Sequence, residues 1–486
     1  MIFFTGGAVT VGPGQIVSEK KAEILRSHLD IQKGNANTKN IVKATKFFES
    51  IAEDASNLSV VIDLFSKSFK LTLVCSLDQV GLMEMKSLAE MTGGSIVMCD
   101  SFQNAVFRKS FAKLFERDEN GQLKLGTATT LTILNSRTFK VSGIIGFCAS
   151  CKSKAINVSD TVVGVGGTNI WKLGGIDKES TYAFFFEITN TVTNPGPIPI
   201  YIQFLTRYLH STGHFRLRVT TVKRIMAAGD ELRSIADSFD QEAAAALVAR
   251  QAVYRTMTGE ESIDVLRSLD RMLIKLVARF GDYRHNDPST FRLPKQFQLY
   301  PQFMYHLRRS QYMQTFGESP DESCYYRDML LKETTGNSLL MIQPAILQYT
   351  VEVPEAAAVL LEMDSMKQNV ILLYDSFFHV LIWHGETIAK WRDARYQDKP
   401  EYANVKLLLE TPIEDAEQIM NERFPVPKFI ICDQGDETGQ ERIIKNRVIP
   451  SNQVITSSLG ADYTNEDVTL KVFTNQLYRL AIQSNS

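Results

Sequence analysis

The chain has 486 residues, of which 44% are hydrophobic and 22% are charged, and its formal net charge is -2 at pH 7. This composition is that of an ordinary soluble protein and excludes disorder on a large scale. A nearly neutral charge balance gives no global field for nucleic acid, so we expect no nucleic-acid partner, and any membrane contact must depend on local patches. At roughly 150 residues per domain, the length predicts about three or four domains.

The cysteines and the apolar runs indicate the compartment. Six cysteines are scattered along the chain, which favours a reducing environment over a disulfide framework. No run approaches the ~18 consecutive apolar residues of a membrane span. The first residues, MIFFTGGAVTVGPG, lack the basic segment that opens a secretory signal. We therefore expect a cytoplasmic protein.

Residues 1–117 are predicted to be the C-terminal part of an α/β domain. Strand-like runs occupy 60–64, 71–76 and 95–98, and residues 81–91 have a helical pattern. The glycine-rich start is not followed by a Gly-Lys-Ser/Thr sequence, so no phosphate-binding loop is predicted. Because this glycine-rich segment begins within the first few residues of the chain, we expect strands or helices that would complete the sheet to be missing.

Residues 118–230 are predicted to form an antiparallel β-sandwich. Short β-rich runs alternate there with turn residues, at 130–134, 138–145, 183–189, 198–205 and 215–221.

Two pairs of potential metal ligands lie in this region. Cys148 and Cys151 form one CxxC pair, but a structural zinc site needs four ligands and no second pair follows at a suitable distance. His210 and His214 have helical spacing, but the Ser-Thr-Gly between them predicts a hairpin turn, which removes the shared face. We therefore predict no metal site and no cofactor in this chain.

Residues 231–336 are predicted to be helical. Ser238 can cap a first helix, whose alanine run at 243–246 has high helix propensity. A second helix over 262–280 carries a one-sided apolar stripe, which is more often bundle core than a partner groove. The aromatic-rich segment 301–314 is compatible with either a surface or the closing helix of the bundle.

Residues 337–486 are predicted to combine strands and helices. Strands are expected at 370–373 and 377–383, and helices at 401–409, 413–423 and 465–483. His384 has no nucleophile or third ligand in its company, so we expect it to have a structural hydrogen-bonding role.

One stretch of this last region carries the functional hypothesis. An apolar strand at 429–432 is followed by a loop rich in Gly and Asp at 433–441, and Arg442 stands where the loop rejoins regular structure. Loops held by a rigid scaffold are where function concentrates. We interpret Arg442 as a candidate arginine finger that enters the nucleotide site of a partner GTPase. The alternative is a solvated arginine beside a turn.

Five long motifs make the sequence resemble a known family. In chain order they are SFDQEAAAALVAR (238–250), YPQFMYHLRRS (300–310), SPDESCYYR (319–327), LIWHGETIAKWR (381–392) and RFPVPKFIICDQG (423–435). The sequence resembles the Sec23 subunits of the COPII vesicle coat over essentially its whole length. The resemblance implies a multidomain α+β fold with a partial α/β, vWA-like trunk at 1–117, a β-sandwich at 118–230, a helical domain at 231–336 and a gelsolin-like domain with a C-terminal helix at 337–486.

The resemblance also implies a function. Sec23 subunits activate the Sar-type small GTPase in vesicle budding and transport from the endoplasmic reticulum to the Golgi. The chain would then supply an arginine in trans and would not itself be an enzyme. Aligning GQERIIKNRVIPS (439–451) with the family's finger loop places the finger on Arg442, flanked by Gln440, Glu441 and Lys445 as candidate partner-binding or positioning residues.

The family also implies partners and a location. These partners are the Sar-type GTPase, the cargo-binding COPII subunit and the outer-coat COPII subunit. The chain would lie in the cytoplasm, in peripheral contact with the endoplasmic reticulum membrane at exit sites and on the vesicle coat. Zinc is expected only in the family's zinc finger, which lies upstream of this sequence.

Three departures from the family pattern bear on these expectations. The zinc finger and the first part of the trunk are absent, as in a fragment or a truncated gene model, which leaves open the GTPase contact and the pairing with the cargo-binding subunit. Residues 65–71 are interpreted as an insertion within a trunk strand. The finger loop is longer, through 436–438, and Glu441 stands where a small residue would be usual. That acid either weakens the attraction to triphosphate or holds the finger by hydrogen bonding before docking.

Other classes of function remain as alternatives. A gelsolin-like cytoskeletal protein would have repeated modules and acidic calcium ligands, whereas this sequence has one module and no calcium loop. A cargo-binding coat adaptor would share the architecture but would not need a guanidinium at position 442. A hydrolase or metalloenzyme is the weakest alternative, because no nucleophile, base and orienting group recur together.

Overall fold

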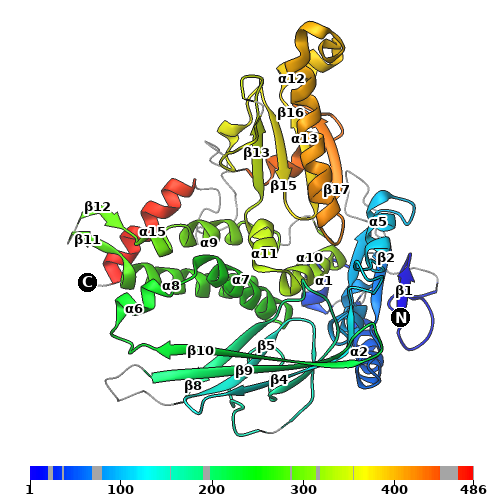
Figure 1. The fold of residues 1–486 in the computed structure, drawn as a ribbon, viewed down its shortest axis with the longest axis vertical. Coiled ribbons are helices and arrows are strands. Elements are labelled where there is room, and N and C mark those ends of the chain that lie inside the picture. Colours follow the sequence, from blue (N-terminus) through cyan, green and yellow to red (C-terminus); the bar gives the residue numbers. More distant parts are fainter. Residues whose placement is uncertain are drawn as a thin grey trace. The chain divides into compact units, whose positions relative to one another are not determined.

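A computed structural model describes residues 1–19, 26–34, 38–67, 79–153, 155–189, 198–284, 287–313, 318–353, 355–448 and 469–484. The chain folds into two compact units (Figure 1). The first contains Met1–Leu266 and Gln311–Thr334, and the second contains Arg267–Ser310 and Thr335–Ser486.

The first unit begins with a parallel sheet of three strands in the order β1-β2-β3. Its strands are β1 (Ile2–Thr5), β2 (Asp63–Lys67) and β3 (Ile96–Cys99), and the helices of this region are α1 (His28–Lys33), α2 (Ile41–Asn57), α3 (Leu82–Met85), α4 (Ser87–Glu90) and α5 (Ala105–Lys113). The predicted strand at 95–98 is confirmed, and the predicted helix at 81–91 is present as two short helices on either side of Lys86.

Strand β2 lies later in the sequence than predicted. The backbone amide of Ile62 donates to the Thr92 hydroxyl at 3.0 Å, so the run from residue 60 leads into the strand and does not form it. Phe65 and Ser66 pair with both β1 and β3, and Lys67 pairs with Cys99 of β3. These three residues of the segment interpreted as an insertion therefore belong to strand β2, and the insertion itself stays a prediction. Residues 68–71 and the strand predicted at 71–76 lie outside the described residues.

The predicted β-sandwich is confirmed. A five-stranded sheet in the order β10-β9-β4-β7-β6 and a two-stranded sheet, β5-β8, enclose a core that contains Trp171, Ile133 and Val141. The strands are β4 (Gly126–Asn135), β5 (Phe139–Ile145), β6 (Ala149–Ser150), β7 (Ile170–Ile176), β8 (Ala183–Ile188), β9 (Ile198–Leu209) and β10 (Phe215–Met226). All five predicted strands are present, and β6 and β7 are additional.

The turn predicted between the two histidines is also confirmed. The His210 amide donates to the His214 carbonyl at 2.9 Å, and Gly213 adopts φ 82°, which a glycine accepts without strain. Strands β9 and β10 therefore run antiparallel from this hairpin, and the two imidazoles share no helical face.

A second group of helices in the first unit comes from outside the trunk and the sandwich. They are α6 (Leu232–Asp237), α7 (Gln241–Met257) and α10 (Pro320–Lys332), and α8 (Ser262–Phe280) begins in this unit and continues into the second. The prediction that Ser238 caps the first long helix is wrong. The Asp240 carboxylate accepts the amides of Glu242 and Ala243 at the start of α7, whereas Ser238 ends α6. Helix α8 has the predicted bounds, and Leu266, Leu269 and Leu273 on its apolar stripe are buried.

The second unit contains the rest of the helical region. Its elements there are the hairpin β11 (Asp282–Arg284) and β12 (Asp287–Arg292), the 3-10 turn η2 (Lys295–Phe297), and helices α9 (Tyr300–Arg308), α11 (Thr335–Ile342) and α15 (Leu470–Ser484). Helix α9 buries Tyr300, Met304 and Leu307, so the aromatic-rich segment is mainly a packed helix. The α15 ring of Tyr478 stacks on Phe291 of β12 with a centroid distance of 4.3 Å, which anchors the C-terminal helix.

The same unit ends in a five-stranded sheet in the order β14-β13-β15-β16-β17, in which only the β16 and β17 pair is parallel. The strands are β13 (Ala345–Tyr349), β14 (Ala357–Ala358), β15 (Ile371–Asp375), β16 (His379–His384) and β17 (Lys428–Asp433). The helices are α12 (Glu386–Asp393), α13 (Ala403–Glu422) and α14 (Arg442–Lys445), with 3-10 turns η3 (Met363–Ser365), η4 (Tyr396–Asp398) and η5 (Pro400–Tyr402).

The two helices predicted at 401–409 and 413–423 are one continuous helix, α13, with Pro412 inside it. Proline removes one intrahelical hydrogen bond and usually breaks a helix. Here Leu408 and Ala416, one turn before and one turn after the proline, are both buried in the same hydrophobic cluster. Packing of both halves against one sheet face offsets the lost hydrogen bond.

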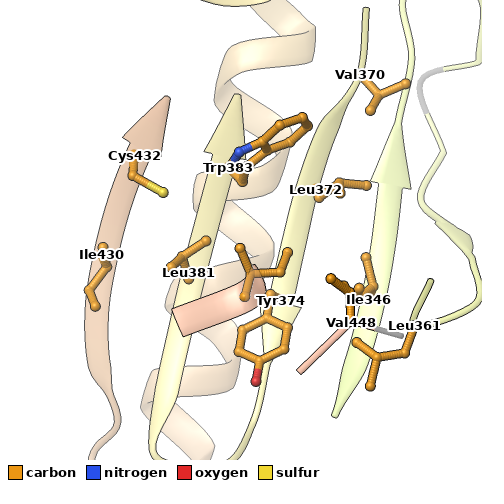
Figure 2. Packing of buried hydrophobic residues seen from close by; sticks show 11 residues of the cluster. Ile346, Leu361, Val370, Leu372, Tyr374, Leu381, Trp383, Ile430, Cys432 and Val448 are labelled. Atoms are coloured by element: carbon orange, nitrogen blue, oxygen red, sulfur yellow. The ribbon is translucent and has the colours of Figure 1, made fainter. Parts of the chain in front are cut away.

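The two faces of this sheet bury different clusters. Alternate residues such as Ile371, Val380 and Ile382 pack against α12 and α13. On the opposite face, Leu372, Leu381, Trp383, Ile430 and Cys432 form a second cluster with Ile444 and Val448 (Figure 2). The segment that follows the polar loop therefore covers the second face of the sheet.

Candidate functional site

Arg442 is the first residue of α14, directly after the loop that leaves β17. The predicted strand and loop are therefore confirmed. Gly435 and Gly439 adopt φ of 80° and 77° in that loop, a left-handed conformation that favours glycine. The Arg442 amide donates to the Gly439 carbonyl at 3.2 Å. Its side chain is exposed, and within the described part of the chain it has no hydrogen bond or ion pair.

Packing of the helical turn decides which way Arg442 faces. Glu441, Ile444 and Val448 are buried at helical spacing, whereas Arg442 and Lys445 are exposed. The buried residues meet the sheet cluster that contains Trp383. Arg447, one turn later, donates from its guanidinium to the Ile342 carbonyl at 2.9 Å. The core thus fixes the helix phase that directs Arg442 to solvent.

Glu441 is buried, with only 4% of its surface exposed. Its Oε1 accepts the indole N–H of Trp383 at 3.0 Å. Its Oε2 accepts the Gly435 amide at 3.1 Å and pairs with Lys445 Nζ at 2.6 Å. The acid that the sequence places beside the finger therefore points into the core, where it bonds to neighbours other than the finger.

Gln440 and Lys445 lie at the surface around Arg442. Gln440 is exposed and lines an open hollow of about 450 Å³ together with Arg392, Ile431, Cys432, Asp433, Gln434, Gly435, Asp436 and Thr438. The Lys445 side chain is 43% exposed while it pairs with Glu441. The structure therefore brings Arg442, Gln440, Glu441 and Lys445 together in one turn, with three of the four accessible to a partner.

A partly exposed ion pair supports one side of the hollow. Arg392 donates to both carboxylate oxygens of Asp433, each at 2.8 Å, in a bidentate pair. This pairing lowers the pKa of Asp433. His384 Nδ1 lies 3.2 Å from the same carboxylate and 3.0 Å from Arg392, and burial lowers the pKa of this histidine. The structural hydrogen-bonding role expected for His384 is confirmed.

Trp383 and Arg392 fix the surroundings of the candidate finger, and neither residue is predicted from the sequence. Both residues belong to the motif LIWHGETIAKWR, which indicates the family. The motif does not indicate that Trp383 contacts Glu441 or that Arg392 contacts Asp433, which lie later in the chain. A buried indole needs an acceptor for its N–H. This requirement is the signal that the sequence offers for a contact of Trp383, and it does not identify which residue accepts the hydrogen bond.

The described residues hold no candidate metal centre. They contain no group of three or more His, Cys, Asp or Glu side chains that could hold a metal ion. Cys148 is buried and Cys151 is partly buried, and burial raises the pKa of both thiols. No helix among the described residues is both long enough and apolar enough to cross a membrane.

Four family models match the chain in succession. They are the Sec23/Sec24 trunk domain at residues 1–118, the Sec23/Sec24 beta-sandwich domain at 126–227, the Sec23/Sec24 helical domain at 240–340 and the gelsolin repeat at 352–439. The first three together match more than half of the chain. The chain belongs to the Sec23/Sec24 family. The predicted multidomain α+β architecture is confirmed, whereas the boundaries placed between the domains stay predictions.

A solved structure supports the same fold. The crystal structure of the human COPII-coat protein Sec24c matches with a TM-score of 0.73 and 15% sequence identity. The match covers 100% of this chain and 61% of the Sec24c chain. The Sec23/Sec24 family models do not separate the Sec23 branch from the Sec24 branch.

Proposed function

We propose that this chain is a COPII coat subunit of the Sec23 type, which activates a Sar-type small GTPase through Arg442. The observation that carries the proposal is the exposed guanidinium at the start of α14. It has no side-chain partner within the described residues, while the opposite face of the same turn is buried in the core. A cation held in this way is available to a ligand outside the protein.

The chemistry of GTP hydrolysis explains why an arginine is needed there. The transition state spreads negative charge over the β–γ oxygens, and an arginine supplied in trans contributes about 10³ to 10⁵ in rate. A guanidinium remains charged and offers several N–H donors in one plane, whereas a lysine offers one compact ammonium group. The chain would act as an activator, and turnover would belong to the GTPase.

The COPII assignment also proposes partners and a location. Members of a coat contact one another, so we include the cargo-binding subunit and the outer-coat subunit among the partners of this chain. The protein would act in the cytoplasm, in peripheral contact with the endoplasmic reticulum membrane at exit sites, during vesicle budding toward the Golgi. The Sec23/Sec24 domains and the likeness to a COPII-coat protein support this proposal.

A second candidate is a cargo-binding adaptor of the Sec24 type. The likeness to the COPII-coat protein Sec24c, which covers 100% of this chain, favours it. The two candidates differ in one property. An activator needs Arg442 for GTP hydrolysis, whereas an adaptor binds cargo whether or not the guanidinium is present.

The test measures GTP hydrolysis by a Sar-type GTPase on anionic liposomes, with and without this chain. The Sec23-type proposal expects acceleration by the wild type and its loss in Arg442→Ala, with binding of the GTPase retained. Binding without acceleration would overturn the activator proposal and favour the adaptor. An absence of both binding and acceleration would also overturn it for this chain.

A further inference from the structure

We propose that Glu441 is a positioning residue: its inward-facing carboxylate fixes the turn that presents Arg442, and Lys445 balances its charge. This inference rests on the proposed function of Arg442. The sequence leaves open a repulsive charge or a direct hydrogen bond to the finger, and the partners of Glu441 are Trp383, Gly435 and Lys445, not Arg442. The role that remains to be compared with repulsion is a brace for the turn.

Three donors from different parts of the fold meet at this carboxylate. The Trp383 indole comes from β16, the Gly435 amide comes from the start of the loop, and the Lys445 ammonium comes from the end of α14. Both carboxylate oxygens are occupied. Burial of a charge is costly unless the charge is paired and hydrogen-bonded, and this acid meets both conditions.

The bond to Gly435 closes the finger loop. Gly435 stands six residues before Glu441, so one side chain ties the beginning of the loop to its end. The bond to Trp383 attaches the closed loop to the sheet, because this indole is fully buried in the core beneath α14. Arg442 follows Glu441 directly, so the backbone position from which the Arg442 side chain extends is fixed relative to β16.

The charge arrangement argues against a repulsive role. The carboxylate is directed inward, and Lys445 Nζ lies 2.6 Å from Oε2. Residues 441–445 contain one acid and two bases, which leaves one positive charge on the turn. Screening of Glu441 by its own lysine allows the Arg442 guanidinium to act on phosphate oxygens without a competing free acid on the same turn.

The two roles predict opposite effects of removing the charge. A repulsive acid weakens the attraction of the turn to triphosphate, so Glu441→Gln and Glu441→Ala would both raise the maximal rate of hydrolysis. A positioning acid has the reverse effect, because a displacement of about 1 Å at a reacting centre can cost on the order of 100-fold in rate. Gln preserves one acceptor of nearly the same shape, and Ala preserves none.

The experiment uses the full chain and measures stimulated GTP hydrolysis against activator concentration for the wild type, Glu441→Gln and Glu441→Ala. We expect Glu441→Ala to lower the maximal rate about tenfold or more, with little change in the half-saturating concentration. Glu441→Gln should fall between Glu441→Ala and the wild type. Hydrogen exchange of the segment 433–448 should quicken in Glu441→Ala, because the Gly435 amide loses its acceptor.

Two further variants make the outcomes distinct. Glu410→Ala removes an exposed acid that pairs with Lys406 on α13 at the same i,i+4 spacing, and it should leave hydrolysis and exchange of 433–448 unchanged. If Arg442→Ala matches the wild type, the proposed finger itself fails. If Arg442→Ala is inactive but Glu441→Ala matches or exceeds the wild type, only the positioning role is overturned. If Glu441→Ala does not fold, Glu441→Gln decides: a maximal rate below the wild type supports the role, and an equal or higher rate overturns it.

Discussion

The indole N–H of Trp383 donates to Glu441 Oε1 at 3.0 Å, which connects a core strand of the gelsolin-like domain to the residue before the candidate finger. The tryptophan is fully buried, so the donor has no access to water in the folded state. The bond satisfies the indole and one oxygen of a buried acid at the same time.

Trp383→Phe should therefore destabilise the second unit. The ring keeps most of its apolar contacts, but the Glu441 carboxylate loses a donor, and a buried acceptor left without its partner costs about 1–3 kcal/mol. Denaturant unfolding should show a lower midpoint with an unchanged slope. Trp391→Phe, at a partly buried indole on α12, is the control. Equal midpoints for Trp383→Phe and the wild type would show that the hydrogen bond between Trp383 and Glu441 does not stabilise the protein.

The stability of the protein should fall as the pH falls below the ordinary pKa of a histidine. Burial lowers the pKa of His384 from 6.5, so the unfolded chain binds a proton there more readily than the folded one. The contribution of His384 is fully present above about pH 6.5 and is lost as the pH decreases below that value. Asp433 and Arg392 face the imidazole and act in opposite directions on its charge.

The measurement compares the free energy of unfolding of the wild type and His384→Asn between about pH 7 and pH 5. His28 and His306 also have lowered pKa values and contribute the same sign, so the variant should retain part of the slope. We expect a shallower pH dependence in His384→Asn. Identical slopes would show that His384 does not titrate differently in the folded and unfolded states.

A third prediction concerns the first unit, where Asp321 of α10 is buried against the trunk. Its carboxylate accepts the amides of Val80 and Gly81, each at 2.8 Å, and Arg26 lies 3.6 Å away. Arg26 keeps Glu84 as an ionic partner when Asp321 is removed, but the buried amides of Val80 and Gly81 lose their acceptor, which costs about 1–3 kcal/mol for each amide.

Asp321→Ala should lower the free energy of unfolding by this amount, as measured by denaturant titration. Asp321→Asn retains an acceptor oxygen and should cost less than Asp321→Ala. Asp240→Ala, which removes an exposed helix cap on α7, is the matched control and should cost about 1 kcal/mol. A loss in Asp321→Ala no larger than in this control would contradict a structural role for the trunk contact.

Elements with a strong local pattern could be predicted from the sequence. The bounds of α8 follow from its apolar stripe, and β17 and the β9–β10 hairpin follow from an apolar run and a Gly-containing turn. The failures have one tertiary and one local cause. Pro412 remains within α13 because both neighbouring turns are buried, and Asp240 replaces Ser238 as a cap because it stands directly before the helix.

The candidate site was predictable only in part. Arg442 could be placed because a strand, a glycine-containing loop and an arginine follow one another in the sequence. The inward direction of Glu441 could not be predicted, because its acceptor role depends on Trp383, which lies 58 residues earlier. The pairing of Arg392 with Asp433 depends on contacts over a similar separation.

The most direct measurement is the maximal rate of GTP hydrolysis by a Sar-type GTPase at saturating concentrations of this chain, for the wild type, Arg442→Ala and Arg442→Lys. Arg479→Ala, which removes an exposed arginine from α15, is the matched control. We expect Arg442→Ala to lose about 10³-fold or more in stimulated rate, Arg442→Lys to recover little of it, and both variants still to bind the GTPase. A stimulated rate in Arg442→Ala equal to that of the wild type would show that Arg442 is not an arginine finger.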